Sequence, residues 1–268
     1  MTWWEAPYEH LRVRREEDGV AVLVLDLPER RNMMSDAMTS SWRRAIEGIK
    51  DDPEVRCVVV GGAGPAFSSG GDLSWIGREP DAPIERLRAR MDRFYRAWLS
   101  ITDLEIPTVA AVSGPAIGAG LALALACDLR FVAEDARLSA PFTRLGMHPG
   151  MLTTWSLART AGLAVARDLL LTGRSIDGIE AVRLGLANRA LPVGEVLAVA
   201  LETARGIAAN APVATRLTKL ALAGAGHADF DAAIRWEALA QAVTLASEDL
   251  REGLAAQRER RLPRFTGH

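Results

Sequence analysis

The pattern of apolar and polar positions changes several times along the first half of the chain. Residues 11–15 alternate apolar with basic side chains, and an almost continuous apolar run follows at residues 20–27. Asp18-Gly19 lies between these two runs, and the central positions of a tight hairpin turn favour positive φ, which Gly and Asp tolerate. We therefore predict an antiparallel hairpin whose second strand ends at Pro28.

Strand-like and helix-like segments alternate after this hairpin. Ser35 is a favourable helix N-cap, and apolar residues recur behind it at helical spacing, at positions 38, 42, 46 and 49. Short buried strands are predicted at residues 56–60, 108–113 and 129–133, and helices at about residues 83–102 and 121–126. Such alternation predicts an α/β fold in which helices cover a parallel sheet.

The chain after Gly150 is predicted to be almost entirely helical. Candidate helices cover residues 176–185, 193–210, 212–223 and 229–247, and the remaining segment is amphipathic and basic. Runs of strands followed by runs of helices can form separate units. We therefore expect an α/β core at residues 1–200 and a C-terminal helical region at residues 201–268.

Composition and charge narrow the class of protein. The chain has 268 residues, of which 49% are hydrophobic and 25% charged, as is ordinary for a globular protein with a sizeable core. A net charge of -2 gives no bulk attraction to nucleic acid or to an anionic membrane, so we expect neither as a partner. The apolar runs are shorter than the ~20 residues of a membrane helix, and we expect a cytoplasmic protein. Cys57 and Cys127 lie in apolar runs and should be small buried side chains.

Two glycine-rich loops follow predicted strands and carry the candidate chemistry. They are FSSGGDL at residues 67–73 and SGPAIGAG at residues 113–120. Ligands of parallel sheets bind beyond the carboxyl ends of the strands, and small residues allow them to approach the backbone. Two free N–H groups that converge on one oxygen form an oxyanion hole. Either loop alone can also be a tight turn. Neither has the Gly-Lys-Ser/Thr ending of a Walker loop, and GAGLAL lacks the last glycine of a dinucleotide fingerprint.

Several segments taken together resemble one known family. AFSSGGDL, followed by SGPAIGAGLALALACDLRF, resembles the crotonase superfamily, that is, the enoyl-CoA hydratase/isomerase family. Four further segments resemble the same family in the same order along the chain: PERRN at residues 28–32, LGMHPGM at 145–151, LLLTGRSIDGIEAVRLGLANRAL at 169–191 and REGLAAQRERRLPRF at 251–265. The resemblance therefore covers nearly the whole chain.

The resemblance implies a crotonase-like spiral of ββα units with a C-terminal helical trimerisation region. It implies a homotrimer or a dimer of trimers, and an acyl-CoA thioester as substrate or ligand. Coenzyme A would be part of the substrate, with no permanently bound cofactor and no metal. The N–H groups of Gly71 and Ala119 would hold the thioester oxygen and stabilise an enolate during hydration, isomerisation or decarboxylation.

The chain departs from the family pattern at the expected catalytic acids. The two hydratase glutamates match Ala122 and Phe142, and the base of a related isomerase matches Gly150. None of these side chains can transfer a proton. His148 is the nearest titratable residue in the sequence, and we consider it both as a general base and as an ordinary surface or packing histidine. Asp72 is expected to cap the following helix rather than to act in catalysis.

The resemblance also suggests residues that bind the ligand. The candidates for substrate or CoA binding are Arg31, Ser69, Gly71, Asp72, Leu73, Ala119 and Phe142. Arg30, Arg258, Arg260 and Arg261 could bind CoA phosphates or be solvated surface charge, and Trp75, Ile76 and Trp155 could line an acyl pocket or lie in the core. Two functional hypotheses remain open: a lyase or isomerase that acts on an acyl-CoA, and a non-catalytic acyl-CoA-binding protein.

Overall fold

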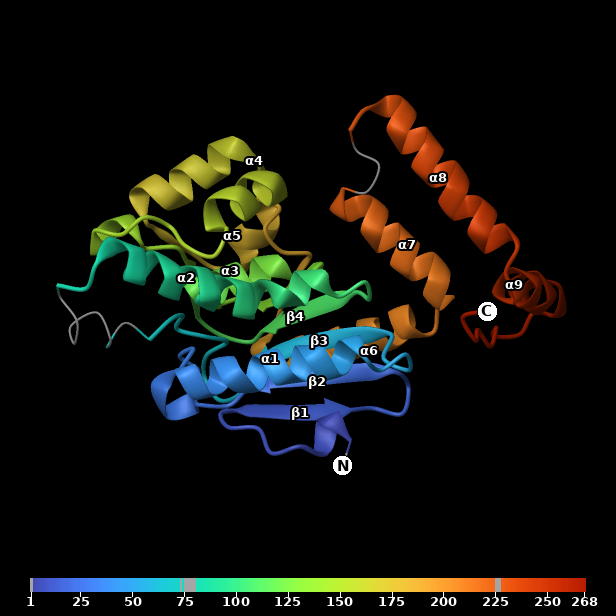
Figure 1. The fold of residues 1–268 in the computed structure, drawn as a ribbon, viewed down its shortest axis with the longest axis horizontal. Coiled ribbons are helices and arrows are strands. Elements are labelled where there is room, and N and C mark those ends of the chain that lie inside the picture. Colours follow the sequence, from blue (N-terminus) through green and yellow to red (C-terminus); the bar gives the residue numbers. More distant parts are fainter. Residues whose placement is uncertain (1, 73, 75–80, 225–227) are drawn as a thin grey trace.

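The computed structural model describes residues 2–72, 74, 81–224 and 228–268. Within these residues the larger sheet has the order β1-β2-β3-β4-β6-β9 and a smaller sheet the order β5-β7-β8 (Figure 1). The strands are β1 (Leu11–Arg15), β2 (Val20–Leu25), β3 (Cys57–Gly62), β4 (Thr108–Val112), β5 (Ala116–Ile117), β6 (Leu129–Ala133), β7 (Leu138–Ser139), β8 (Ser175–Ile176) and β9 (Arg189–Leu191).

The larger sheet confirms the predicted hairpin and the predicted parallel pairing. β1 and β2 are antiparallel, with Leu11 opposite Leu25, and Gly19 in the turn has φ +80°. From β2 onward every neighbouring pair in this sheet is parallel. All residues of β4 are buried, as expected of a central strand with both faces covered.

Helices surround these sheets. They are α1 (Asp36–Lys50), α2 (Ile84–Leu99), α3 (Ala119–Ala126), α4 (Thr153–Thr172), α5 (Gly178–Arg183), α6 (Val196–Ala208), α7 (Pro212–Ala223), α8 (Phe230–Leu245) and α9 (Glu248–Glu259). Short 3-10 turns cover Trp3–Glu5, Pro28–Arg30, Ser100–Asp103, Thr143–Leu145 and Val193–Glu195. Ser35 caps α1 as predicted, because its Oγ accepts the N–H of Met38 at 3.1 Å.

Two segments differ from the predicted elements. The helix expected at residues 176–185 is shorter, because strand β8 takes Ile176 and Asp177 caps α5 by accepting the N–H of Glu180 at 2.7 Å. α4 lies at residues 153–172, within the part of the chain that was predicted to be mostly helical but outside the four candidate helices. Gly162 interrupts this helix with φ +84°, which breaks the helical period of its apolar side chains.

α7, α8 and α9 form an arm that projects from the sheet-containing body (Figure 1). α7 and α8 contain no fully buried residue. The arm is anchored at α7, where Lys219 Nζ donates to the carbonyl of Ile106 at 2.7 Å and pairs with Asp128 at 2.9 Å. α6 instead packs against β3 and β4, so the expected boundary at residue 200 falls inside a helix that belongs to the body.

Cys57 and Cys127 are free and buried, which confirms the sequence prediction. Burial raises the pKa of each thiol to about 12, because the interior disfavours the charged thiolate. Both residues therefore act as small apolar side chains of the core. Among the described residues, no helix combines the length and the apolar character that a membrane span requires.

Candidate oxyanion site

Two loops leave neighbouring strands at the same edge of the larger sheet. Residues 63–72 follow β3 and residues 113–118 follow β4, which is its parallel neighbour. The N–H of Ile117 donates to the carbonyl of Ser68 at 2.9 Å, and Phe67 and Ser68 both donate to the carbonyl of Pro115 at 3.1 Å. These bonds continue the strand pairing beyond the sheet and hold the two loops side by side.

Gly70 sets the distance between the loops. Its φ of +93° is strained for any side-chain-bearing residue, and a Cβ there would lie 2.7 Å from the carbonyl oxygen of Ile117 and 3.2 Å from the nitrogen of Ala119. The Gly70 N–H donates to Ser68 Oγ at 3.1 Å, and its carbonyl accepts the N–H of Met34 at 2.8 Å. Gly70 is therefore held on both sides, through its own N–H and through the carbonyl of the peptide that joins it to Gly71.

Two backbone donors lie next to this junction, the N–H of Gly71 and the N–H of Ala119. Ala119 is the first residue of α3, and the first N–H groups of a helix have no partner within the helix. In the described part of the chain, no hydrogen bond uses the N–H of Ala119 or the N–H of Gly71. A helix N-terminus favours negative charge, and two fixed donors can share one oxygen on which charge develops. The arrangement therefore suits an oxyanion.

Asn32 ties a third loop to the site. It is fully buried, and its Oδ1 accepts the N–H of Leu27 at 2.9 Å. Its Nδ2 donates to the carbonyls of Ala63 at 2.8 Å and Ala66 at 2.7 Å, and its own carbonyl accepts Ser68 Oγ at 2.8 Å. Asn32 belongs to the PERRN segment, but neither its burial nor its distant partners can be inferred from that segment alone.

The same loop brings together two of the predicted binding residues. The N–H of Ser69 donates to the carbonyl of Arg31 at 2.8 Å, and the Arg31 side chain is exposed. Asp72 accepts the N–H of Ser74 at 2.9 Å, so it stabilises the turn of its own loop. Leu73, Trp75 and Ile76 lie outside the described residues.

Aromatic rings lie next to both donor loops. A Cβ on Gly71 would lie 3.6 Å from Cζ of Phe94, which belongs to α2. A Cβ on Gly118 would likewise lie 3.6 Å from Cζ of Phe142. Phe142 therefore lies next to Gly118, the residue before Ala119. Phe94 had not been predicted beside either loop, since it comes from a helix that its own sequence pattern does not place relative to the loops.

The positions at which acids were expected belong to three different segments of the chain. Ala122 is buried within α3, and Phe142 is half-buried beside Gly118. Gly150 lies against Tyr95, because a Cβ on Gly150 would overlap the Tyr95 hydroxyl and lie 2.9 Å from its Cζ. His148 lies on the exposed side of this loop. Tyr95 is half-buried, and burial raises the pKa of its hydroxyl.

The other residues considered from the sequence lie at the surface. Trp155 is 56% exposed, and the guanidinium of Arg159 lies 4.5 Å from its ring centre, so Trp155 is not a core residue. Arg261 is paired with Glu252 and Glu259, each at 2.6 Å. Arg30, Arg258 and Arg260 are exposed. Among the described residues, no group of three or more His, Cys, Asp or Glu side chains could hold a metal ion.

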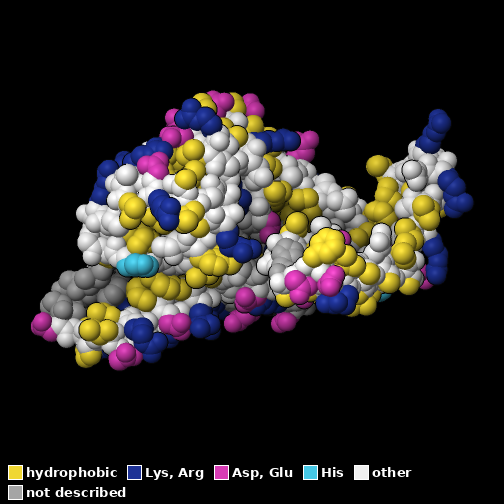
Figure 2. All heavy atoms as spheres, turned by 90° about the horizontal axis from the view of Figure 1, so that it is seen from above, with side chains coloured by type: hydrophobic (Ala, Val, Ile, Leu, Met, Phe, Trp, Pro, Cys, Tyr) yellow, Lys and Arg dark blue, Asp and Glu magenta, His cyan; other side chains and the backbone are white. Residues whose placement is uncertain are grey.

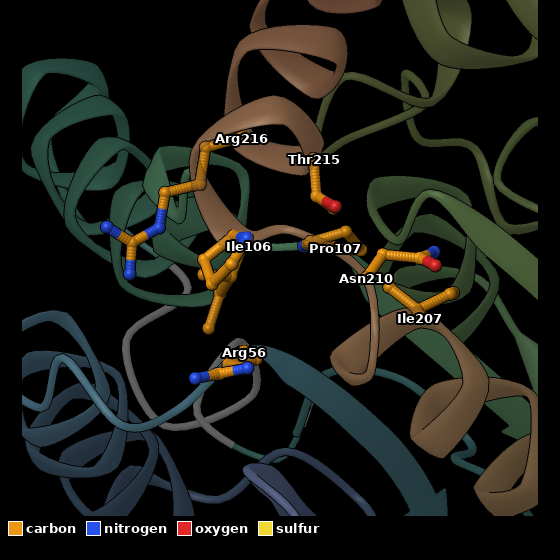
Figure 3. Close-up of a pocket in the computed structure, with 8 residues that line it drawn as sticks. Arg56, Ile106, Pro107, Ile207, Asn210, Thr215 and Arg216 are labelled. Carbon is orange, nitrogen blue, oxygen red and sulfur yellow. The ribbon is translucent and has the colours of Figure 1, made fainter. Parts of the chain in front are cut away.

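A small hollow lies at the opposite end of the parallel strands (Figure 3). Its volume is about 10 Å³, and it is bounded by residues that precede β3 and β4 and by the start of α7. The labelled lining residues are Arg56, Ile106, Pro107, Ile207, Asn210, Thr215 and Arg216. This hollow has room for about one water at most, and it lies away from the carboxyl edge where parallel sheets bind ligands.

Fold and site together define an α/β protein that presents paired backbone donors at the carboxyl edge of a parallel sheet. The enoyl-CoA hydratase/isomerase family model matches residues 15–268. A Thermus thermophilus relative named for enoyl-CoA hydratase is 41% identical over 256 residues, which are 94% of this chain and 100% of the relative. The bovine enoyl-CoA hydratase domain-containing protein 2 is 34% identical over 258 residues, covering 93% of this chain and 85% of the relative.

Solved structures agree with these relatives. The enoyl-CoA hydratase of Bacillus anthracis superposes with a TM-score of 0.91 at 31% identity, over 97% of this chain and 100% of that chain. The chain belongs to the enoyl-CoA hydratase/isomerase family, and its fold is the crotonase fold.

Proposed function

We propose that the protein binds an acyl-CoA thioester with the thioester oxygen between the N–H groups of Gly71 and Ala119. The observation that carries this proposal is that neither N–H has a partner among the described residues, although Gly70 holds their two loops in contact. The relatives named for enoyl-CoA hydratase support the choice of a CoA ester. The exposed Arg31 beside Ser69 is proposed to contact the CoA portion.

Two fixed donors would polarise the thioester carbonyl and lower the energy of an enolate. When the α-carbon loses a substituent but keeps the bonding electron pair, negative charge moves to the thioester oxygen, which this proposal places between the two donors. One such donor contributes roughly 3–4 kcal/mol of transition-state stabilisation in other enzymes. This site could therefore support any reaction of the thioester that passes through an enolate.

Decarboxylation fits the side chains better than isomerisation or the addition of water does, because both of these need a group that transfers a proton. Positioned acids and bases contribute about 10²–10⁴-fold each, and Ala122, Phe142 and Gly150 offer none. A malonyl-type thioester reaches the enolate when its C–CO₂ bond breaks, without any base. His148 remains a proposed base for substrates that need one. The same three positions also favour the second candidate function, a non-catalytic acyl-CoA-binding protein.

We further propose a homotrimer or a dimer of trimers, assembled through the C-terminal arm. Figure 2 shows hydrophobic side chains along the arm. The exposed apolar residues of α7 and α8 include Leu222, Phe230, Ile234, Leu239 and Val243, and Phe230 is 79% exposed. An arm with this much exposed apolar surface is typical of a protein–protein interface, and a second copy of the chain is the proposed partner.

Mass-spectrometric turnover of a panel of CoA esters tests the proposed function. The panel contains enoyl-, 3-hydroxyacyl- and malonyl-type esters, each incubated with the intact protein. A product would identify the reaction. Saturable binding without any product would favour the acyl-CoA-binding protein, and absence of binding by every ester would contradict both candidate functions.

A further inference from the structure

Two consecutive aromatic residues of α2 reach two different loops. Phe94 lies beside Gly71, and Tyr95 lies beside Gly150. Their ring centres are 6.2 Å apart, with the planes inclined by 65°. The Tyr95 ring is therefore a near neighbour of the ring that borders the Gly71 donor, although Gly150 belongs to a separate loop.

The Tyr95 hydroxyl has no hydrogen-bond partner among the described residues. Half-buried tyrosine hydroxyls usually find one, as Tyr8 does by donating to the carbonyl of Trp3 at 2.6 Å. The Tyr95 hydroxyl is therefore able to donate a hydrogen bond to a bound ligand.

The loop opposite the hydroxyl is shaped to leave it room. Any side chain at Gly150 would overlap the hydroxyl oxygen. The next two residues, Met151 and Leu152, have φ of +50° and +56°, in the left-handed region that non-glycine residues rarely adopt. Backbone strain of this kind persists where the surrounding structure requires it, and it occurs often at ligand sites.

We propose that the Tyr95 hydroxyl is a specificity-determining group that donates a hydrogen bond to an oxygen on the acyl chain of the bound thioester. The substrate class would be acyl-CoA esters with an oxygen at C3, in preference to unsubstituted acyl chains. This inference rests on the proposed function, because it places the thioester oxygen at Gly71 and Ala119. The acyl chain then runs past Phe94 toward Tyr95.

The preference follows from what each acyl chain does to the hydroxyl. An unsubstituted chain removes water from the hydroxyl and leaves it unpaired, which carries the full desolvation cost. A chain with a C3 oxygen accepts the hydrogen bond instead. Sites with a polar group for the substrate discriminate strongly against analogues that lack its partner. The hydroxyl stays neutral and able to donate at physiological pH.

The test compares two four-carbon esters that differ at C3. Dissociation constants of acetoacetyl-CoA and butyryl-CoA are measured by calorimetry for the full-length protein, for Tyr95→Phe and for Tyr8→Phe. We expect the wild-type protein to bind acetoacetyl-CoA about tenfold more tightly than butyryl-CoA. Tyr95→Phe removes one oxygen atom and should abolish this preference. Tyr8→Phe is the matched control and should keep it, because Tyr8 bonds to Trp3.

Each outcome separates this inference from the proposed function. If the wild-type protein binds both esters equally, or if Tyr95→Phe keeps the preference, the role of Tyr95 is overturned and acyl-CoA binding stands. If neither ester binds, both proposals fail. Should Tyr95→Phe not fold, Gly150→Ala provides the second variant, because its methyl group displaces the hydroxyl and should also abolish the preference.

Discussion

The α-carbon of Gly70 faces the backbone nitrogen of Ala119, and a Cβ on Gly70 would lie 3.2 Å from that nitrogen. This contact joins a loop that follows β3 to the first turn of α3, which follows β4. Because Gly71 is the next residue, the contact also determines how close its N–H lies to the Ala119 N–H. The spacing of the two donors thus depends on one glycine.

Gly70→Ala should therefore disrupt both stability and binding. The residue has φ +93°, and a methyl group would lie 2.7 Å from the carbonyl oxygen of Ile117. We expect the free energy of unfolding to fall by about 1–3 kcal/mol, measured by urea denaturation. Acyl-CoA binding should weaken at least tenfold.

Gly206→Ala is the control for that substitution. Gly206 lies in α6, and a Cβ there would meet no atom within 4 Å. Alanine should raise the free energy of unfolding by about 0.4–1 kcal/mol and leave binding unchanged. Equal stability of the two variants would show that the Gly70 contact does not constrain the loops.

Asn32→Ala should destabilise the protein by about 2–4 kcal/mol, because it leaves a buried N–H and two buried carbonyls without their partner. The affected groups belong to Leu27, Ala63 and Ala66. Urea denaturation measures the loss. Asn210→Ala is the control, since Asn210 is exposed, and it should change stability by no more than about 0.5 kcal/mol. A similar loss in both variants would contradict the bridging role of Asn32.

The buried thiols predict a loss of stability at alkaline pH. The pKa of Cys57 and of Cys127 is raised from an ordinary 9.0 to about 12 in the folded protein. The unfolded chain thus loses these protons first, so stability is full below about pH 9 and declines as pH rises toward 12. Urea midpoints across this range measure the decline. In the double Cys→Ala variant, the midpoint should fall less from its own value at neutral pH than it does in the wild-type protein.

Thiol labelling checks the same burial independently. Both cysteines should react with a disulfide reagent only after unfolding, since each is buried in the folded protein. Rapid labelling of the native protein near neutral pH would contradict the burial of these thiols and the alkaline prediction that depends on it.

Introducing charge into the arm should prevent assembly. Phe230→Asp places a carboxylate at a large apolar side chain that is 79% exposed. Sedimentation velocity should show a trimer or hexamer for the wild-type protein and smaller species for the variant. Thr218→Asp adds the same charge at an exposed polar residue of α7 and should disturb assembly less. A monomeric wild-type protein would contradict the proposed assembly.

The elements with clear periodic patterns could be predicted from the sequence, and the tertiary contacts could not. The hairpin around Gly19, the strand at residues 129–133 and the helix at residues 212–223 follow from local patterns. The two donor loops could be paired because they follow strands of one parallel sheet. Tyr95 could not be placed beside Gly150, because they are distant in sequence and meet only when α2 packs on the fold. Strands of two or three residues, such as β5 and β9, are too short to show a period.

The carbonyl stretching frequency of bound, carbonyl-labelled butyryl-CoA tests the central claim most directly. Ala119 is the first residue of α3, where proline is tolerated, so Ala119→Pro removes the N–H and preserves the helix. Ala119→Ser keeps the N–H and is the matched control. If the two N–H groups hold the thioester oxygen, the frequency falls on binding to the wild-type and Ala119→Ser proteins and falls less with Ala119→Pro. A bound ester whose frequency equals that of the free ester in all three proteins would contradict the oxyanion site.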